Sequence, residues 1–123
     1  MSKRLLVADD ALIIREIIKD TALSAGWEIA GEASDGQMAI EKYQELRPDV
    51  CTIDLVMPEY DGLHGLRGIK ALDPEAKVVV VSALDQKTVL KAAFDLGISD
   101  FIVKPFDKAS LLDTLEQLVT EAG

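Results

Sequence analysis

Short apolar runs alternate with stretches of helical periodicity along the whole chain, and this alternation constrains the fold more than any other feature. The stretch after each run carries apolar residues every three or four positions, as an amphipathic helix does. Five such strand–helix units predict an α/β fold, in which a doubly wound five-stranded parallel sheet is covered by five helices on both faces. The runs expected to form the strands are residues 4–8, 27–33, 50–53, 77–82 and 100–103.

Residues that break or cap helices mark the ends of the helical stretches. Gly26 and Gly97 stand where the first and fourth helices should stop, and Asp107 is suited to cap the last one. Gly65 and Gly68 lie inside the third helical stretch, where each glycine lowers helix stability by about 1 kcal/mol relative to alanine. These glycines weaken the predicted third helix.

The composition fits one acidic domain that spans residues 1–123. A chain of this length can bury a core, and 49% of its residues are hydrophobic. The formal net charge of −9 disfavours nucleic acid or an anionic membrane as a direct partner, because both require a basic surface, but it is compatible with a bound cation. The single cysteine, Cys51, cannot form an internal disulfide, and no apolar run is long enough to span a membrane. A cytoplasmic location is therefore expected.

Polar residues stand at the carboxyl ends of four predicted strands. Asp9 and Asp10 follow the first strand, Asp54 follows the third, and Ser82 and Lys104 stand at the ends of the fourth and fifth. Because the carboxyl ends of parallel strands meet at one edge, where open α/β sheets bind ligands, these side chains are expected to share one site. The acids would repel one another without a cation, and Mg²⁺ prefers oxygen ligands. A carboxylate nucleophile, Mg²⁺, a lysine and a hydroxyl suit in-line phosphoryl transfer to a carboxylate.

Asp54 has the most demanding position of these acids. It ends the buried run 50–53, where a desolvated carboxylate is unfavourable unless a cation or hydrogen-bond donors meet it. One alternative is that Asp54 only caps the turn before Pro58, and another is that the acids and the lysine form a salt-bridged loop cluster. Five polar groups at four strand ends favour the phosphoryl-transfer site over both.

Four stretches, in this order, resemble the response-regulator receiver domain of two-component signalling. They are V-A-D-D at 7–10, D-L-V-M-P-E-Y-D-G at 54–62, V-S-A at 81–83 and D-F-I-V-K-P-F at 100–106. The resemblance spans essentially the whole chain and is strongest to the stand-alone regulators of chemotaxis. It implies a flavodoxin-like sheet with the strand order 2-1-3-4-5, counted along the chain.

The resemblance also implies a role for the residues of the predicted site. Asp54 would be the phosphoacceptor, and Lys104 would bind the phosphoryl group, held by a cis peptide bond to the following proline. The ligands of Mg²⁺ would be Asp10 directly, Asp9 through water, the Asp54 carboxylate and the backbone carbonyl of Val56.

Further positions would govern switching and the lifetime of the signal. Ser82 would turn inward to donate a hydrogen bond to the phosphoryl group, and Phe101 would follow into the space that Ser82 leaves. Many chemotaxis regulators have tyrosine at the position of Phe101. The phenylalanine can still move inward by packing, but it has no hydroxyl to offer a partner. Val56 and Leu84 are apolar where fast-hydrolysing relatives are often polar. The aspartyl phosphate is therefore expected to hydrolyse slowly and to need a phosphatase, or back-transfer to a kinase, for its removal.

The function implied is that of a response regulator that catalyses only its own phosphotransfer and slow autodephosphorylation. It would take a phosphoryl group from a sensor histidine kinase and, as a monomer, switch its binding to a protein target such as a component of the flagellar switch. Two alternatives within the family are a phosphorelay intermediate and the isolated receiver of a larger regulator.

The fourth helical stretch has more apolar residues than its core-facing side needs. Leu90 and Phe94 are expected on its outer side, next to Phe101 and rimmed by Lys87 and Lys91. An exposed apolar patch on a small acidic protein usually marks a partner site, so this face is the expected target surface. The alternative is that Leu90 and Phe94 pack under neighbouring side chains.

Two other classes of protein share parts of this pattern. A flavin-binding module would need Ser, Thr and Gly after the first strand, where Asp9 and Asp10 stand. A phosphohydrolase with an aspartyl nucleophile, of the haloacid dehalogenase type, would normally have a second acid where Val56 stands.

His64, the only histidine, has no second His or Cys beside it, so it is expected to be a solvated side chain and not a metal ligand.

Overall fold

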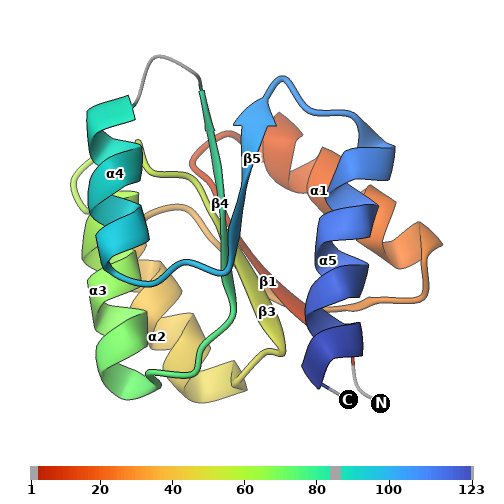
Figure 1. Ribbon diagram of the computed structural model, residues 1–123, viewed down its shortest axis with the longest axis horizontal. Coiled ribbons are helices and arrows are strands. Elements are labelled where there is room, and N and C mark those ends of the chain that lie inside the picture. Colours follow the sequence, from red (N-terminus) through yellow and green to blue (C-terminus); the bar gives the residue numbers. More distant parts are fainter. Residues whose placement is uncertain (1–2, 84–86, 123) are drawn as a thin grey trace.

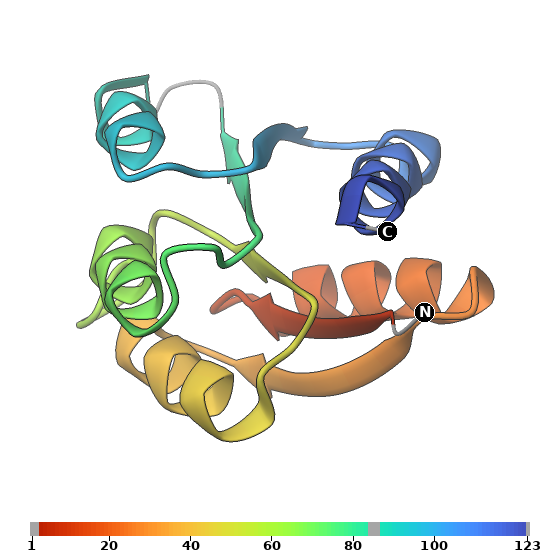
Figure 2. The same ribbon diagram turned by 60° about the horizontal axis from the view of Figure 1, so that its bottom comes forward.

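The computed structural model describes residues 3–83 and 87–122 and has the predicted doubly wound architecture (Figures 1 and 2). The bounds of the elements, in chain order, are β1 (Arg4–Ala8), α1 (Leu12–Ser24), β2 (Glu28–Ala33), α2 (Gly36–Leu46), β3 (Val50–Ile53), α3 (Gly62–Leu72), β4 (Val78–Ala83), α4 (Lys87–Asp95), β5 (Asp100–Lys104) and α5 (Lys108–Ala122). Within these described ranges, none of the helices combines the length and the apolar character needed to cross a membrane.

All strand pairs are parallel, and the strand order is β2-β1-β3-β4-β5, as predicted. The central strands β1, β3 and β4 are almost entirely buried, because helices cover both of their faces. Since the strands run in the same direction, their carboxyl ends lie along one edge of the sheet. That edge is where the predicted site residues stand.

Each face of the sheet has its own hydrophobic core. On one face, side chains such as Leu6 and Ile53 pack against α2, α3 and α4. On the other face, side chains such as Leu5 and Val7 pack against α1 and α5. Figure 2 shows these two helical layers on opposite sides of the sheet. Successive residues of a strand point to opposite faces, so one short apolar run supplies both cores.

Aspartates cap the amino ends of α2, α3 and α5. The carboxylates of Asp35, Asp61 and Asp107 each accept a hydrogen bond from the backbone N–H three residues further on, at 2.7 to 2.9 Å. The cap at Asp107 confirms the prediction. After α1 and α4, Gly26 and Gly97 have φ values of +85° and +89°, a left-handed conformation that glycine adopts without strain.

The glycines of α3 allow α2 to pack closely against it. A Cβ at Gly68 would collide with the side chain of Ile40 in α2, and a Cβ at Gly65 would lie 3.1 Å from Gly36. The helix forms over Gly62–Leu72 despite these residues, because its other face is buried in the core. Tertiary packing thus outweighs the low helix propensity that the sequence indicated.

Candidate functional site

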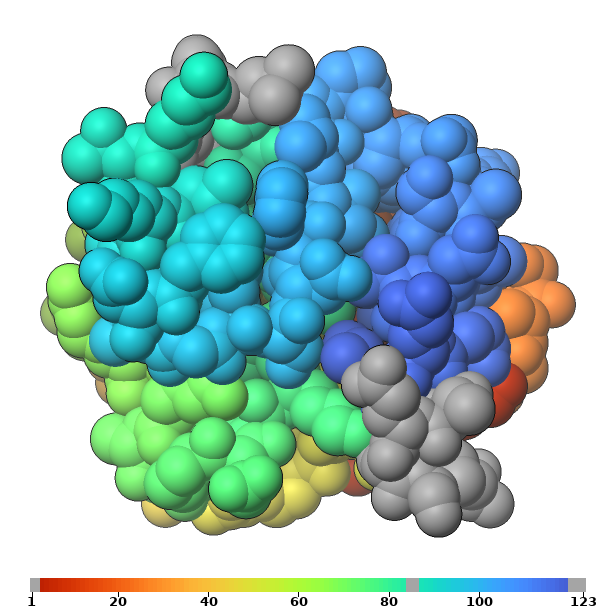
Figure 3. All heavy atoms as spheres, viewed as in Figure 1, coloured from red at the N-terminus to blue at the C-terminus, as the bar shows by residue number. Residues whose placement is uncertain are grey.

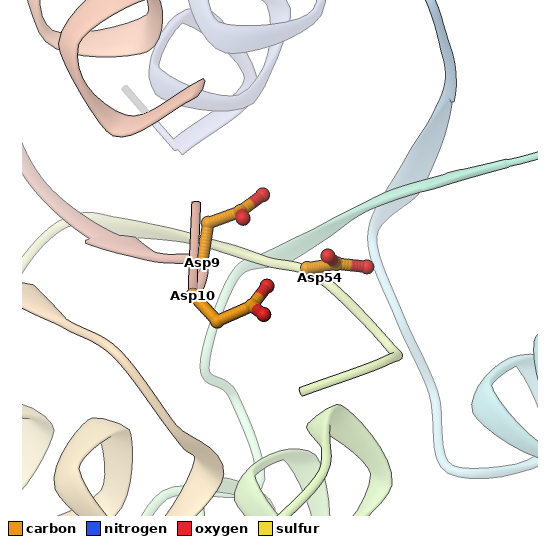
Figure 4. A group of neighbouring side chains, drawn as sticks. All are labelled: Asp9, Asp10 and Asp54. Atoms are coloured by element: carbon orange, nitrogen blue, oxygen red, sulfur yellow. The ribbon is translucent and has the colours of Figure 1, made fainter. Parts of the chain in front are cut away.

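Three aspartates gather at the carboxyl edge of the sheet, as the parallel topology predicted (Figure 4). Asp9 and Asp10 follow β1, and Asp54 follows the neighbouring strand β3. One carboxylate oxygen from each residue lies within 4.8 Å of the others. Asp9 and Asp54 are buried, with 1% and 7% of their surface exposed, whereas Asp10 faces solvent. The cluster therefore combines two desolvated acids with one that water can reach.

Lys104, the last residue of β5, joins the two buried aspartates. Its Nζ lies 2.9 Å from Oδ2 of Asp9 and 3.0 Å from Oδ2 of Asp54. One positive charge between two buried carboxylates offsets part of their mutual repulsion. Burial lowers the pKa of Lys104, but the hydrogen bonds and negative charges of the two aspartates outweigh it, so the pKa lies above its ordinary value. Lys104 is therefore held as a cation within the cluster.

The surroundings of Asp54 make its carboxyl group more basic than that of an ordinary aspartate. Burial raises the pKa, and the backbone N–H of Val56, 3.2 Å from Oδ1, opposes this effect only in part, as does the ammonium group of Lys104. The bond from Val56 also makes Asp54 a cap for the following turn. The turn-capping role weighed from the sequence thus coexists with the acidic cluster, and a more basic carboxylate suits a nucleophile.

The two aspartates after β1 differ in how firmly the protein engages them. Oδ1 of Asp9 accepts the N–H of Ala11 at 2.9 Å, Oδ2 faces Lys104, and the backbone carbonyl of Asp9 accepts a hydrogen bond from Arg15 at 2.7 Å. Asp10 has no side-chain hydrogen bond or ion pair within the described part of the chain. Asp10 is therefore the acid freest to bind an added cation directly.

The donor atoms of this cluster fit a hard divalent cation. The three carboxylates offer oxygen atoms, and neither histidine nor cysteine belongs to the described cluster. Mg²⁺ prefers oxygen ligands, keeps several of its waters and commonly uses one or two carboxylates. The exposure of Asp10 leaves solvent access for such waters. The residues present thus match the chemistry of Mg²⁺ better than that of a softer metal.

Ser82 and the peptide bond after Lys104 complete the predicted edge. Ser82 is buried near the end of β4 and lies opposite Val103 of β5. Its hydroxyl donates to the carbonyl of Ala83 at 3.4 Å. The Lys104–Pro105 peptide bond is cis, as the resemblance implied. Leu84, the second position expected to slow hydrolysis, lies outside the described residues.

The apolar patch predicted between α4 and β5 contains Phe94 and Phe101, but not Leu90. Phe94 is 50% exposed and Phe101 38%, and their rings pack edge to face with centroids 5.5 Å apart. Lys87 and Lys91 are exposed on the same helix. The prediction that Leu90 faces outward is wrong: it is half-buried against the core, because the nine-residue α4 covers the sheet with a stripe wide enough to include it. Figure 3 shows this face, formed by α4, β5 and α5 side by side.

His64 is not the freely solvated side chain that the sequence predicted. It is half-buried, its Nε2 lies 2.7 Å from Oε1 of Gln37, and its ring contacts the ring of Tyr60 with centroids 4.8 Å apart. These contacts connect α2, the β3–α3 loop and the start of α3. Gln37 and His64 are 27 positions apart and meet only because α2 packs against α3, so no local pattern in the sequence indicates the bond.

Known proteins resemble this chain along nearly its whole length. A family model for the response regulator receiver domain matches residues 5–116. The chemotaxis protein CheY of Thermotoga maritima is 43% identical over 118 residues, which cover 96% of this chain and 98% of that protein. CheY of Bacillus subtilis is 40% identical over 117 residues, covering 95% of this chain and 98% of that protein. The crystal structure of the CheX–CheY–BeF₃–Mg²⁺ complex from Borrelia burgdorferi matches with a TM-score of 0.89 and 31% identity, covering 95% of this chain and 89% of that chain.

The fold and the acidic edge define a signalling receiver and not a classical enzyme. The chain belongs to the response regulator receiver domain family. Its similarity to CheY proteins makes it a receiver of the CheY type, consistent with two-component signalling and chemotaxis. Receiver domains bind Mg²⁺ at an acidic pocket, and this structure has a cluster of three aspartates at the carboxyl edge of its sheet. The flavin-binding module and the aspartyl phosphohydrolase are thereby set aside.

Proposed function

We propose that this protein accepts a phosphoryl group on Asp54 from a sensor histidine kinase and thereby controls a protein target in chemotaxis. The observation that carries this proposal is the contact of Lys104 with both Asp9 and Asp54 at the carboxyl edge of the sheet. Lys104 pairs with two of the three clustered acids, which leaves negative charge for a divalent cation to balance. The similarity to proteins named CheY supports the assignment to chemotaxis.

Asp54 is the nucleophile of the proposed reaction. An oxygen of its carboxylate attacks the phosphorus of the donor phosphohistidine, in line with the bond to the donor nitrogen. The P–O bond forms as the P–N bond breaks, the electron pair stays on the imidazole, and the product is an acyl phosphate. Lys104, 3.0 Å from Oδ2 of Asp54, remains charged and can shift from Asp9 to a phosphoryl oxygen. The Ser82 hydroxyl turns toward the phosphoryl group and donates a second hydrogen bond.

The carboxylates of Asp9, Asp10 and Asp54 and the carbonyl of Val56 would hold Mg²⁺. When bound, Mg²⁺ supplies positive charge that offsets the carboxylates and attracts the phosphoryl oxygens. Asp10 would be a direct ligand, because it is exposed and has no partner in the described part of the chain. Asp9 would act through water, as the resemblance to receiver domains implies, while its carboxylate stays bonded to Ala11 and Lys104.

The output surface in this proposal is the face formed by α4, β5 and α5. Phe101 would move inward after Ser82 turns, which would break its edge-to-face contact with Phe94 and change the exposed apolar surface. Lys87 and Lys91 would attract a partner segment that carries acidic residues beside its apolar anchors. A component of the flagellar switch is the proposed target. The complex of the Borrelia burgdorferi relative with CheX supports a further protein partner, which we propose to be a phosphatase.

The test of the chemistry is phosphorylation by acetyl phosphate and by a histidine kinase, followed by the mass of the intact protein. The wild-type protein is expected to gain one phosphoryl group in Mg²⁺ and none in EDTA. Asp54→Asn should abolish the gain, whereas Asp10→Asn should require more Mg²⁺ to reach it. Asp113→Asn, at an exposed position of α5, is the matched control and should label normally. Undiminished labelling of Asp54→Asn would disprove the assignment.

The test of the output surface is binding of the protein, with and without BeF₃ and Mg²⁺, to a flagellar-switch component of the same organism. Phe94→Glu is expected to abolish binding, because it places a charge in the apolar patch. Leu23→Glu is the matched control, since Leu23 is 54% exposed on α1, on the opposite face of the sheet. Equal binding by both variants would remove Phe94 from the interface.

A further inference from the structure

The loop at residues 55–61, which follows the phosphoacceptor, is hydrogen-bonded to the start of α2. The carbonyl of Leu55 accepts the N–H of Gly62 at 3.0 Å, which closes the loop on itself. The carbonyl of Tyr60 accepts the N–H of Gly36 at 2.6 Å. A Cβ at Gly36 would collide with the carbonyl oxygen of Asp61, so the turn before α2 lies directly against the loop.

Side-chain contacts extend this connection between the loop and α2 across the surface of α2 and α3. Nε2 of Gln37 donates to Oε2 of Glu41 at 3.2 Å, which leaves Oε1 of the same amide for Nε2 of His64 at 2.7 Å. Because a carboxylate only accepts hydrogen bonds, Glu41 sets the orientation of the Gln37 amide, and His64 donates from Nε2. The His64 ring in turn lies against Tyr60, with centroids 4.8 Å apart. The bond between Gln37 and His64 is thus oriented from both ends and reaches the loop through Tyr60.

The connection between the loop and α2 affects the phosphorylation site through the backbone of the loop. Val56 donates its N–H to Oδ1 of Asp54 at 3.2 Å, and its carbonyl is the proposed backbone ligand of Mg²⁺. A Cβ at Gly62 would collide with the carbonyl oxygen of Asp54, so the closed end of the loop packs on the phosphoacceptor itself. Only residues 57–59 separate Val56 from Tyr60, so holding Tyr60 limits the movement of Val56.

We propose that the hydrogen bond between Gln37 and His64 is a positioning contact for the phosphorylation site. It holds the 55–61 loop so that the carbonyl of Val56 keeps its place for Mg²⁺, an inference that rests on the proposed function of Val56 as a ligand. Gln37 and His64 act through the loop and not on the reacting atoms. Their loss relaxes the loop and lowers Mg²⁺ affinity without removing any ligand, as contacts behind metal ligands generally do.

The experiment measures Mg²⁺ affinity by titration calorimetry, with no phosphoryl donor present. Gln37→Met and His64→Leu are each expected to weaken Mg²⁺ binding about threefold to tenfold, below the loss typical for a group bonded directly to a ligand. Because both substitutions remove the same bond, the double variant should be no weaker than the weaker-binding of the two single variants. Gln44→Met is the matched control on α2, since Gln44 is exposed and without a hydrogen bond in the described residues. It should keep the wild-type affinity.

A purely structural role for this bond predicts a different result. It would lower the urea midpoint of unfolding in Gln37→Met but leave the Mg²⁺ affinity of the folded protein unchanged, and that outcome overturns the proposal. Losses that multiply in the double variant also overturn it. His64→Gln keeps an N–H donor for Gln37 and is expected to bind Mg²⁺ more tightly than His64→Leu, so equal affinities would contradict the proposal even if Gln37→Met failed to fold. Persistent labelling of Asp54→Asn, in contrast, refutes the proposed function whatever these affinities are.

Discussion

Thr52 of β3 offers a direct test of how this core is held together. In the described part of the chain, its hydroxyl is the buried side-chain group that lacks a hydrogen-bond partner, and the residue is 0% exposed. Thr52 lies between Val7 of β1 and Val79 of β4 in the sheet register. Thr52→Val replaces the hydroxyl with a methyl group of nearly the same size and completes a row of valines. The substitution is therefore expected to stabilise the protein.

The size of the effect follows from the removed hydroxyl. A buried hydroxyl without a partner destabilises a protein by about 1–3 kcal/mol, so Thr52→Val should raise the free energy of unfolding by about 1–2 kcal/mol. An unfolding entropy of about 2.1 cal/mol/K per residue over 123 residues translates each kcal/mol into about 4 °C of melting temperature. The melting temperature should accordingly rise by about 4–8 °C.

The assay is urea unfolding followed by circular dichroism and by the fluorescence of Trp27, the only tryptophan. The midpoint should rise with no change in the dependence of the free energy on urea. Thr21→Val is the matched control, because the hydroxyl of the buried Thr21 donates to the carbonyl of Ile17 at 2.7 Å. It should destabilise the protein by about 0.5–1.5 kcal/mol. A midpoint for Thr52→Val at or below the wild-type value would refute the reasoning, since the hydroxyl would then have a partner such as a buried water.

Three further predictions concern the lifetime of the signal, acid stability and the thiol. Val56→Asn should speed the loss of phosphate after donor removal in Mg²⁺, because the 51% exposed valine cannot orient an attacking water and an amide can; equal decay of parent and variant would contradict this. Hydrogen bonds from Trp27 and Lys3 hold the pKa of Glu116 below its usual 4.5, so this carboxylate stabilises the fold above that pH and loses its contribution as the pH falls through its folded pKa. The unfolding midpoint of Glu116→Gln should therefore lie below wild type near neutral pH and approach it in acid, whereas a gap that stays constant with pH would argue against the ion pair. Burial raises the pKa of Cys51 to about 12, so iodoacetamide at neutral pH should label it only as fast as the protein opens; rapid labelling of the native protein, detected by mass, would count against burial.

The strand–helix units were predictable from the sequence because burial acts on each segment separately. A central strand that helices cover on both faces, such as the run 77–82, is apolar on both faces, and an amphipathic helix shows its period without its neighbours. The gathering of Asp9, Asp54 and Lys104 was predictable for a related reason. In a parallel sheet all the carboxyl ends lie on one edge, so the strand–helix alternation that predicts parallel strands also predicts that these residues share that edge.

Only the tertiary structure decided how these segments turn and approach one another. The close packing of α2 on α3 over Gly65, the inward turn of Leu90 and the bond between Gln37 and His64 depend on contacts between distant segments. The same holds for the hydroxyl of Thr52, which lacks a partner because its sheet neighbours are valines. The physical reason is that the apolar pattern of a segment specifies which side it buries, but not the rotation or the distance at which its partner packs. Those two quantities are set by many side chains at once, through close packing of the whole core.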